Sequence, residues 1–201
     1  MGGGAVIEKV TAFVTRDART APGGREVLVF RHSNPRAGIQ LPAGSVEVGE
    51  AIEAAVLREV AEETGLTDVV ITGEPERAAL ELDDDQVYLV EHPSRWRARG
   101  IAVGSPVTRL LEADGDHARL EARDPHGKPL PLRVTPDAFT RDVRRWLFHL
   151  ELRRAAPERF ERAFDTPEPW SFYWVDLDFG PRLRDRHREW FAQMRPRLWV
   201  G

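Results

Sequence analysis

The charged segment at residues 50–64 constrains the fold of this chain more than any other feature. It is rich in Glu, Ala, Leu, Val and Arg, it contains no Gly or Pro, and Gly65 follows it. This composition favours a helix, and a glycine directly after such a segment is typical of a helix end. The sequence therefore predicts a helix over about residues 50–64 that ends at Gly65.

Three acids of this predicted helix, Glu59, Glu62 and Glu63, share one face. At about 100° per residue, their side chains fall within an arc of about 100°. Acids four positions apart destabilise a helix by roughly 0.2–0.5 kcal/mol, so we expect a positive charge between Glu59 and Glu63. Mg²⁺ prefers oxygen ligands and is one candidate, whereas a solvated, charge-rich helix face is the alternative. Arg58 points toward the Glu62 side and could pair with an acid such as Glu50.

Apolar runs before and after this helix are typical of strands. The runs at residues 10–15 and 26–30 are separated by the turn signal Ala-Pro-Gly-Gly. Further strands are predicted at residues 69–72, 86–90, 145–152 and 171–177. A closing amphipathic helix is predicted at residues 184–194, with these residues facing inward: Trp190, Phe191 and Met194. Strands and helices in this order predict an α/β fold.

The segment at about residues 92–140 differs from the rest of the chain. It is polar, it contains repeated prolines and glycines, and its apolar content is low for a core of its own. A chain of 201 residues has the length of one domain. We therefore expect a single domain over residues 1–201, in which about 92–140 form an insertion or extended hairpin region.

The composition excludes several classes of protein. With 29 basic and 33 acidic residues and a net charge of −4, the chain has no basic excess for holding a nucleic-acid polymer. It has no Cys, which excludes a disulfide scaffold and a zinc–thiolate site. No segment approaches the ~20 apolar residues of a membrane span, and the start lacks the pattern of an export signal. We expect a cytoplasmic protein with no membrane partner.

The spacing of the charged residues carries a family resemblance. Counting from Gly44, five residues precede Glu50 and seven more precede Arg58, after which the chain reads Glu-Val-Ala-Glu-Glu-Thr-Gly-Leu. This resembles the Nudix box, Gly-x5-Glu-x7-Arg-Glu-U-x-Glu-Glu-x-Gly-U with U aliphatic, at all nine specified positions over residues 44–66. The resemblance implies an α/β/α sandwich with a mixed β-sheet, here with the Pro-rich insertion.

The resemblance also implies an activity and a set of site residues. Members of the family bind Mg²⁺ or Mn²⁺ and hydrolyse a nucleoside diphosphate linked to a group X. The metal-binding and catalytic carboxylates would be Glu59, Glu62 and Glu63, and the residue before the box glycine, Ala43, would offer its carbonyl to the metal. The structural residues of the box would be Glu50 and Arg58, as an ion pair, and the glycines Gly44 and Gly65.

A general base is also expected from the resemblance, either a box glutamate or an acid on a loop before a late strand. Glu168 is the candidate on that loop, since it lies six residues before Trp174 in the segment Thr-Pro-Glu-Pro-Trp-Ser-Phe-Tyr-Trp. An exposed loop acid without a catalytic role is the alternative for Glu168. Glu158 or Glu161 could take the role instead.

The substrate is less constrained by the sequence. Leu41-Pro42-Ala43 before the box resembles the ADP-ribose type, but the proline that such enzymes carry after the box is absent near residues 81–82. We therefore expect a small nucleotide-derived diphosphate, with ADP-ribose or a nucleotide sugar as examples. Candidate substrate contacts, each with a structural or solvated role as the alternative, are Arg36, Tyr88 and Trp96. A homodimer is a further expectation from the resemblance.

Two alternatives to hydrolysis follow from the same fold. Some relatives act as regulators, so a non-catalytic ligand-sensing module is one alternative, against which the complete set of box acids argues. An allylic diphosphate isomerase is the other, and it needs a reactive cysteine that this chain lacks.

Overall fold

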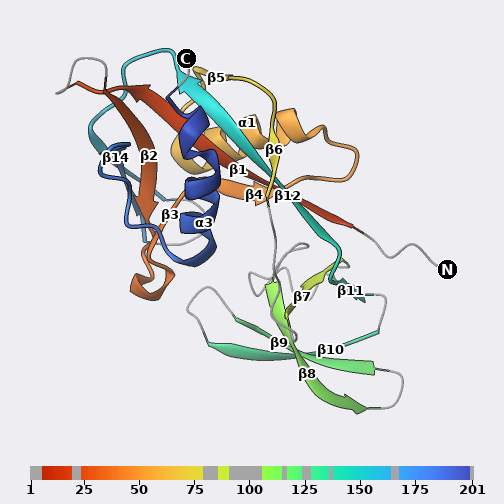
Figure 1. Ribbon diagram of the computed structural model, residues 1–201. Coiled ribbons are helices and arrows are strands. Elements are labelled where there is room, and N and C mark those ends of the chain that lie inside the picture. Colours follow the sequence, from red (N-terminus) through yellow and green to blue (C-terminus); the bar gives the residue numbers. More distant parts are fainter. Residues whose placement is uncertain are drawn as a thin grey trace. The chain divides into compact units, whose positions relative to one another are not determined.

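The computed structural model describes residues 6–19, 24–78, 86–90, 106–114, 117–123, 128–135, 138–163 and 168–199. The chain divides into two compact units. Lys9–Ala79 and Arg145–Gly201 form the unit that carries the box, called the box unit below. Met1–Glu8 and Leu80–Arg144 form the other, called the strand unit because its described elements are strands (Figure 1).

The box unit is built on a nine-stranded sheet. Six strands follow one another in the order β13-β14-β2-β1-β12-β5, while β3 pairs with β2, β4 with β1 and β6 with β12. The strands are β1 (Ile7–Asp17), β2 (Arg25–Arg31), β3 (Ile39–Gln40), β4 (Ala43–Ser45), β5 (Val69–Ile71), β6 (Glu76–Arg77), β12 (Val143–Leu152), β13 (Arg159–Arg162) and β14 (Trp170–Asp176).

The strands of this sheet run in both directions. β2 is antiparallel to β1 and to β14. β1 and β12 run in the same direction, because side-chain contacts join Thr11 to Arg145 and Thr15 to His149, both at a separation of 134 residues. The expected mixed sheet is therefore confirmed.

Helices cover both faces of the sheet (Figure 1). Ala55, Val56 and Val60 of α1 (Ile52–Thr64) are buried in one cluster with Ala12 of β1. The next residue of β1, Phe13, lies on the opposite face and contacts Phe191 of α3 (Asp185–Met194) with ring centroids 6.5 Å apart. This arrangement is the α/β/α sandwich expected from the sequence. Two short 3₁₀ helices are Pro35–Ala37 and Arg195–Arg197.

Both predicted helices are confirmed within two residues at each end. The first ends at Gly65, whose φ of 78° is left-handed and favours glycine. In the second, Trp190, Phe191 and Met194 are buried, as expected from its amphipathic pattern. The short strands β3, β4, β6 and β13 were not predicted, because two to four residues give too little alternation to recognise.

The strand unit holds a five-stranded sheet in the order β10-β9-β8-β7-β11, in which neighbouring strands are antiparallel. Its strands are β7 (Gln86–Leu89), β8 (Pro106–Asp114), β9 (His117–Arg123), β10 (Pro129–Val134) and β11 (Phe139–Thr140).

A buried apolar cluster lies on this second sheet. It includes Val87, Leu89, Leu120, Leu132 and Val134. The expectation that the segment has too few apolar residues for a core is therefore wrong. Alternation along β9 and β10 places small and aliphatic side chains on one face of the sheet. One apolar face is enough to form the buried cluster. One domain over residues 1–201, with an insertion at about 92–140, stays a prediction.

No helix in the described part of the chain is both long enough and apolar enough to span a bilayer.

Candidate active site

Strand β4 brings the start of the box against helix α1. β4 pairs antiparallel with β1, with Gly44 opposite Val10 and Ala43 opposite Thr11. A Cβ atom at position 44 would overlap the carboxylate of Glu59. Only glycine leaves room for that carboxylate, so the first glycine of the box sets how closely the helix approaches the strand.

Glu63 is the most deeply buried acid of the site. Its side chain is on the inner face of α1, and its Oε2 accepts a hydrogen bond from the backbone N–H of Ala43 at 3.1 Å. Burial raises the pKa of Glu63 well above 4.5, and the negative charge of Glu59 raises it further. A carboxylate held in this way is costly to charge unless a cation lies beside it.

Glu59 is the second buried acid, one turn before Glu63 on α1. Burial raises the pKa of Glu59, while the positive charge of Arg58 acts in the opposite direction. Two neighbouring acids are therefore buried in a place where both would gain from a divalent cation.

Arg58 connects four oxygen-bearing groups of the box. Its Nε and Nη2 donate to the two carboxylate oxygens of Glu50, each at 2.9 Å, and Nη2 also donates to the carbonyl of Ser45 at 2.9 Å. Its Nη1 donates to Glu59 at 3.0 Å and to Glu62 at 3.1 Å. The hydrogen bond from Arg58 is the main cause of the lowered pKa of Glu50. The structure thus contains an Arg58–Glu50 ion pair of bidentate geometry.

Glu62 lies at the solvent edge of the same helix, with 46% of its side chain exposed. Its backbone carbonyl accepts a hydrogen bond from Arg162 Nε at 2.9 Å, which fastens β13 to the last turn of α1. The Arg162 guanidinium also fills the space into which a Cβ at Gly65 would project. Glycine is favoured at position 65 for two reasons, because the backbone there is left-handed and because a Cβ atom would clash with the Arg162 guanidinium.

The structure brings the box residues together around the Ala43–Gly44 strand. Within the described residues, no three acidic or histidine side chains form a ready-made metal cluster. Arg58 Nη1 contacts both Glu59 and Glu62, while Glu63 accepts the hydrogen bond from Ala43. The donors nevertheless suit a hard cation, since they are carboxylate oxygens and two of them are buried with raised pKa values.

Lys9 is a residue of the site that was not predicted from the sequence. It is buried on β1 opposite Ser45, to which its Nζ donates a hydrogen bond at 3.1 Å. The pKa of Lys9 is lowered to about 7, mainly by burial and also by the charge of Arg145, while Glu59 acts in the opposite direction. The available signal was a lysine at the start of an apolar strand in a chain whose only other lysine is Lys128.

The three candidates for the general base lie on or beside β13 and β14. Glu168 is exposed two residues before β14. Glu158 is bound by Arg16 at 2.7 Å and by Arg19 at 3.1 Å, and the hydrogen bond from Arg16 lowers its pKa, which weakens it as a base. Glu161 lies on β13, where Ser171 Oγ is 3.5 Å from its Oε1. The assignment of Glu168 stays a prediction.

Among the candidate substrate contacts, the structure describes the side chain of Tyr88. Tyr88 is buried in the strand unit with Ile7 and Val143, which favours its structural role. Trp96 and the side chain of Arg36 lie outside the described residues.

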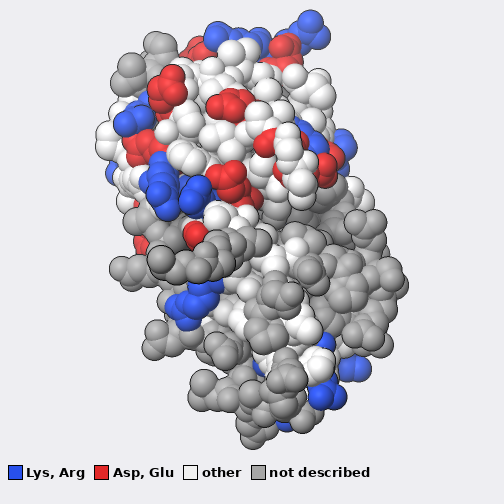
Figure 2. All heavy atoms as spheres, turned by 90° about the vertical axis from the view of Figure 1, so that its right-hand side faces the viewer, with Lys and Arg blue, Asp and Glu red and all other residues white. Residues whose placement is uncertain are grey.

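Acidic and basic side chains are interspersed on the described surface of the face in Figure 2. This mixture agrees with the small net charge of the chain.

Comparison with known proteins gives one family match and several relatives. The family model described as the NUDIX domain matches residues 9–197. An RNA pyrophosphohydrolase of Caulobacter vibrioides is 46% identical over 109 residues, which cover 50% of this chain and 63% of the relative. The chain thus spans less than two thirds of that relative's length.

Solved structures with similarity to this chain share little sequence with it. A NUDIX-family hydrolase from Clostridium perfringens has 14% identity and a TM-score of 0.44, with 96% of this chain and 99% of the other covered. An Ap4A hydrolase of C. elegans has 16% identity and a TM-score of 0.42, with 94% and 96% covered. An E. coli dihydroneopterin triphosphate pyrophosphohydrolase has 16% identity and a TM-score of 0.45, with 94% and 95% covered.

Proposed function

Because this chain belongs to the NUDIX family, we propose that it is a metal-dependent pyrophosphohydrolase that cleaves the diphosphate of a small nucleotide-derived substrate. The observation that carries the proposal is the pair of buried acids Glu59 and Glu63, whose pKa values are raised beside the Ala43–Gly44 strand. A stable core has no need for two adjacent buried acids, whereas a cation site does.

The metal in this proposal is Mg²⁺, with Mn²⁺ as the other candidate. It would be held by Glu59, Glu62 and Glu63, with the backbone carbonyl of Ala43 as a further ligand. A bound divalent ion neutralises phosphate charge and lowers the pKa of a coordinated water.

The residues of the chain position this site. Arg58 fixes the loop before α1 to the helix through Glu50 and the Ser45 carbonyl. Glu63 fixes the end of β4 through the Ala43 N–H. The acceptor of the proton from the attacking water is a carboxylate, and Glu168 is our proposed acceptor because its exposed side chain is open to water.

The proposed substrate is a nucleoside diphosphate linked to X, such as ADP-ribose or a nucleotide sugar. A second candidate is the phosphorylated end of an RNA, which the RNA pyrophosphohydrolase relative favours. The net charge of −4 provides little electrostatic attraction for a long nucleic-acid polymer, so such a substrate would be recognised at its end. A cytoplasmic location and a homodimer stay predictions.

The test is a hydrolysis panel with Mg²⁺ and with Mn²⁺. It contains nucleoside triphosphates, ADP-ribose, nucleotide sugars, dinucleoside polyphosphates, NADH, coenzyme A and a 5′-triphosphorylated oligoribonucleotide. Glu62→Gln is the blank, because Glu62 is exposed and its loss leaves the core packing unchanged. Cleavage by the wild type alone supports the proposal and identifies X. A substrate that binds tightly without being cleaved would instead support the ligand-sensing alternative.

A further inference from the structure

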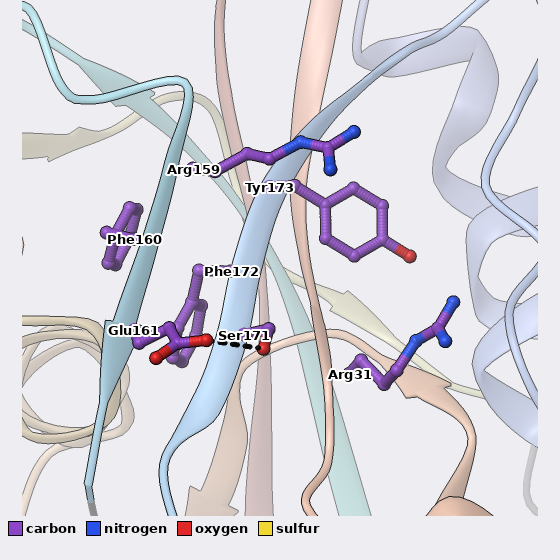
Figure 3. A pocket seen from close by; sticks show the side chains of 7 residues that line it. All are labelled: Arg31, Arg159, Phe160, Glu161, Ser171, Phe172 and Tyr173. Carbon is purple, nitrogen blue, oxygen red and sulfur yellow. Dashed lines mark hydrogen bonds between the residues drawn. The ribbon is translucent and has the colours of Figure 1, made fainter.

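A pocket lies on the box unit, at the edge of its sheet formed by β2, β14 and β13 (Figure 3). Its volume is about 540 Å³. The strand register places Ser171 between Arg31 and Glu161, and it places Tyr173 opposite Arg159. Five polar or aromatic side chains from three strands therefore share one face of the sheet.

This face is opposite the one that α1 covers. Phe30 and Phe172 belong to the buried cluster that packs against α1, and Phe160, which is partly buried, stacks on Phe172 with centroids 5.0 Å apart. Because side chains alternate along a strand, the residues on either side of these phenylalanines project to the other face. The residues that line the pocket come from β2, β13 and β14, and Phe160 and Phe172 of the sheet edge are among them.

Two arginines of this pocket differ from the buried arginines of the same unit. Arg16 and Arg25 on β1 and β2 are bound to carboxylates. In the part of the chain that the structure describes, neither Arg31 nor Arg159 forms an ion pair, and both side chains are exposed. The pocket thus offers two guanidinium groups whose hydrogen-bond donors are open to a ligand.

The other side chains define what such a ligand must carry. In Figure 3 the Tyr173 ring lies between the side chains of Arg159 and Arg31, so a planar ring can stack on it beside an anion. Glu161 offers carboxylate oxygens next to the Ser171 hydroxyl, which suits a ligand with hydroxyl or amino donors. Arginine pairs are suited to phosphate oxygens.

We propose that this pocket binds a nucleoside monophosphate, with the base stacked on Tyr173, the phosphate next to the guanidinium groups of Arg31 and Arg159 on either side of that ring, and a sugar hydroxyl or base amino group on Glu161. This binding does not require the box to be active, so it goes beyond the proposed hydrolysis. The pocket's volume falls in the usual range for small-molecule sites.

The test measures AMP binding by calorimetry in EDTA, which removes the metal from the box and prevents turnover. Wild type and Glu62→Gln are expected to bind AMP equally. Arg31→Ala and Arg159→Ala are each expected to weaken AMP binding by about tenfold or more, since each removes charge-assisted hydrogen bonds. The matched control is Arg154→Ala, whose side chain is 86% exposed and paired with Asp68 outside the pocket, and it should bind as the wild type does.

The contributions of the phosphate and of the base to AMP binding are measured separately, with inorganic phosphate as a second ligand and with the variant Tyr173→Leu. Tyr173→Leu is expected to weaken AMP binding by about fivefold or more while leaving the weaker binding of phosphate unchanged. The proposal is overturned if AMP does not bind at millimolar concentration, or if the two arginine variants bind it like the Arg154→Ala control. Equal affinities for phosphate and AMP would also overturn it, because the ring would then contribute nothing. Circular dichroism of each variant verifies the fold.

Discussion

The carboxylate of Glu63 accepts a hydrogen bond from the backbone N–H of Ala43 at 3.1 Å. This single contact joins the last turn of α1 to β4, the strand that carries the first glycine of the box. A glutamate near the end of a 13-residue helix is thereby held against a strand 20 residues earlier in the chain. The position of the acidic face relative to the Ala43–Gly44 strand depends on it.

Replacing Glu63 with glutamine should show separately how this acid affects hydrolysis and how it affects the stability of the fold. The amide oxygen can still accept the bond from Ala43, while the buried negative charge beside Glu59 is removed. In EDTA at pH 7.5, Glu63→Gln is therefore expected to melt at a higher temperature than the wild type. Its metal-dependent hydrolysis should fall by about a hundredfold or more, because one carboxylate ligand is lost. Full activity with unchanged stability would remove Glu63 from the site.

Substitution of Gly44 tests the close approach of β4 and α1. Gly44→Ala forces a Cβ into the Glu59 carboxylate, so we expect a loss of about 1–3 kcal/mol in the free energy of unfolding together with loss of hydrolysis. Gly49→Ala is the control, since the space around position 49 is open. Its φ of 80° makes alanine cost about 1 kcal/mol there, but hydrolysis should remain. Urea unfolding and initial rates measure both effects, and wild-type rates for Gly44→Ala would contradict the steric argument.

The helix and the ion pair of the box were predictable from the sequence because they are local. Residues 50–64 combine favourable composition with a glycine stop, and Arg58 and Glu50 are eight positions apart in one loop–helix segment. Lys9 was not predictable in this way. Its partner Ser45 is 36 residues away, and only the pairing of β1 with β4 brings the two together.

The second sheet was underestimated for a different reason. Its strands are interrupted by prolines, and β10 even includes Pro129 and Pro131. The apolar positions of β9, such as Ala118 and Leu120, alternate with charged residues, so the mean hydropathy of the segment is low while one face is apolar. A core of this kind can be recognised from the alternation of apolar and charged residues, but not from the average composition of the segment.

Removing Arg58 should destabilise the box more than removing an exposed arginine. Arg58 donates to Glu50, to Glu59 and to the Ser45 carbonyl, and its side chain is only 24% exposed. We expect Arg58→Ala to cost about 1.5–3 kcal/mol in the free energy of unfolding, because charged partners lose their hydrogen bonds. Arg154→Ala, which breaks a solvent-exposed pair, should cost less than about 1 kcal/mol. Equal midpoints in urea for the two variants would show that the network has no structural role.

His149, which is not one of the box acids, is expected to make the stability of the chain depend on pH. His149 is buried on β12, its Nε2 lies 2.8 Å from Thr15 Oγ1, and Arg25 donates to the same hydroxyl oxygen at 2.8 Å. Arg25 can only donate, so the Thr15 hydroxyl accepts from it, and the same hydroxyl also lies 3.4 Å from the carbonyl oxygen of Leu150, to which it donates. The pKa of His149 is lowered from 6.5 to about 4, mainly by burial and also by the charge of Arg25, while Glu151 acts in the opposite direction.

Because the folded state binds this proton less readily than the unfolded state, the contribution of His149 to stability is present above about pH 6.5 and is lost as the pH falls toward about 4. His149→Gln keeps a hydrogen-bonding side chain opposite Thr15 without titrating. The difference in unfolding free energy between wild type and variant should therefore decrease by about 1 kcal/mol between pH 7 and pH 5. Chemical unfolding at half-unit pH steps in EDTA measures this difference, and two parallel curves would mean that His149 is protonated equally in both states.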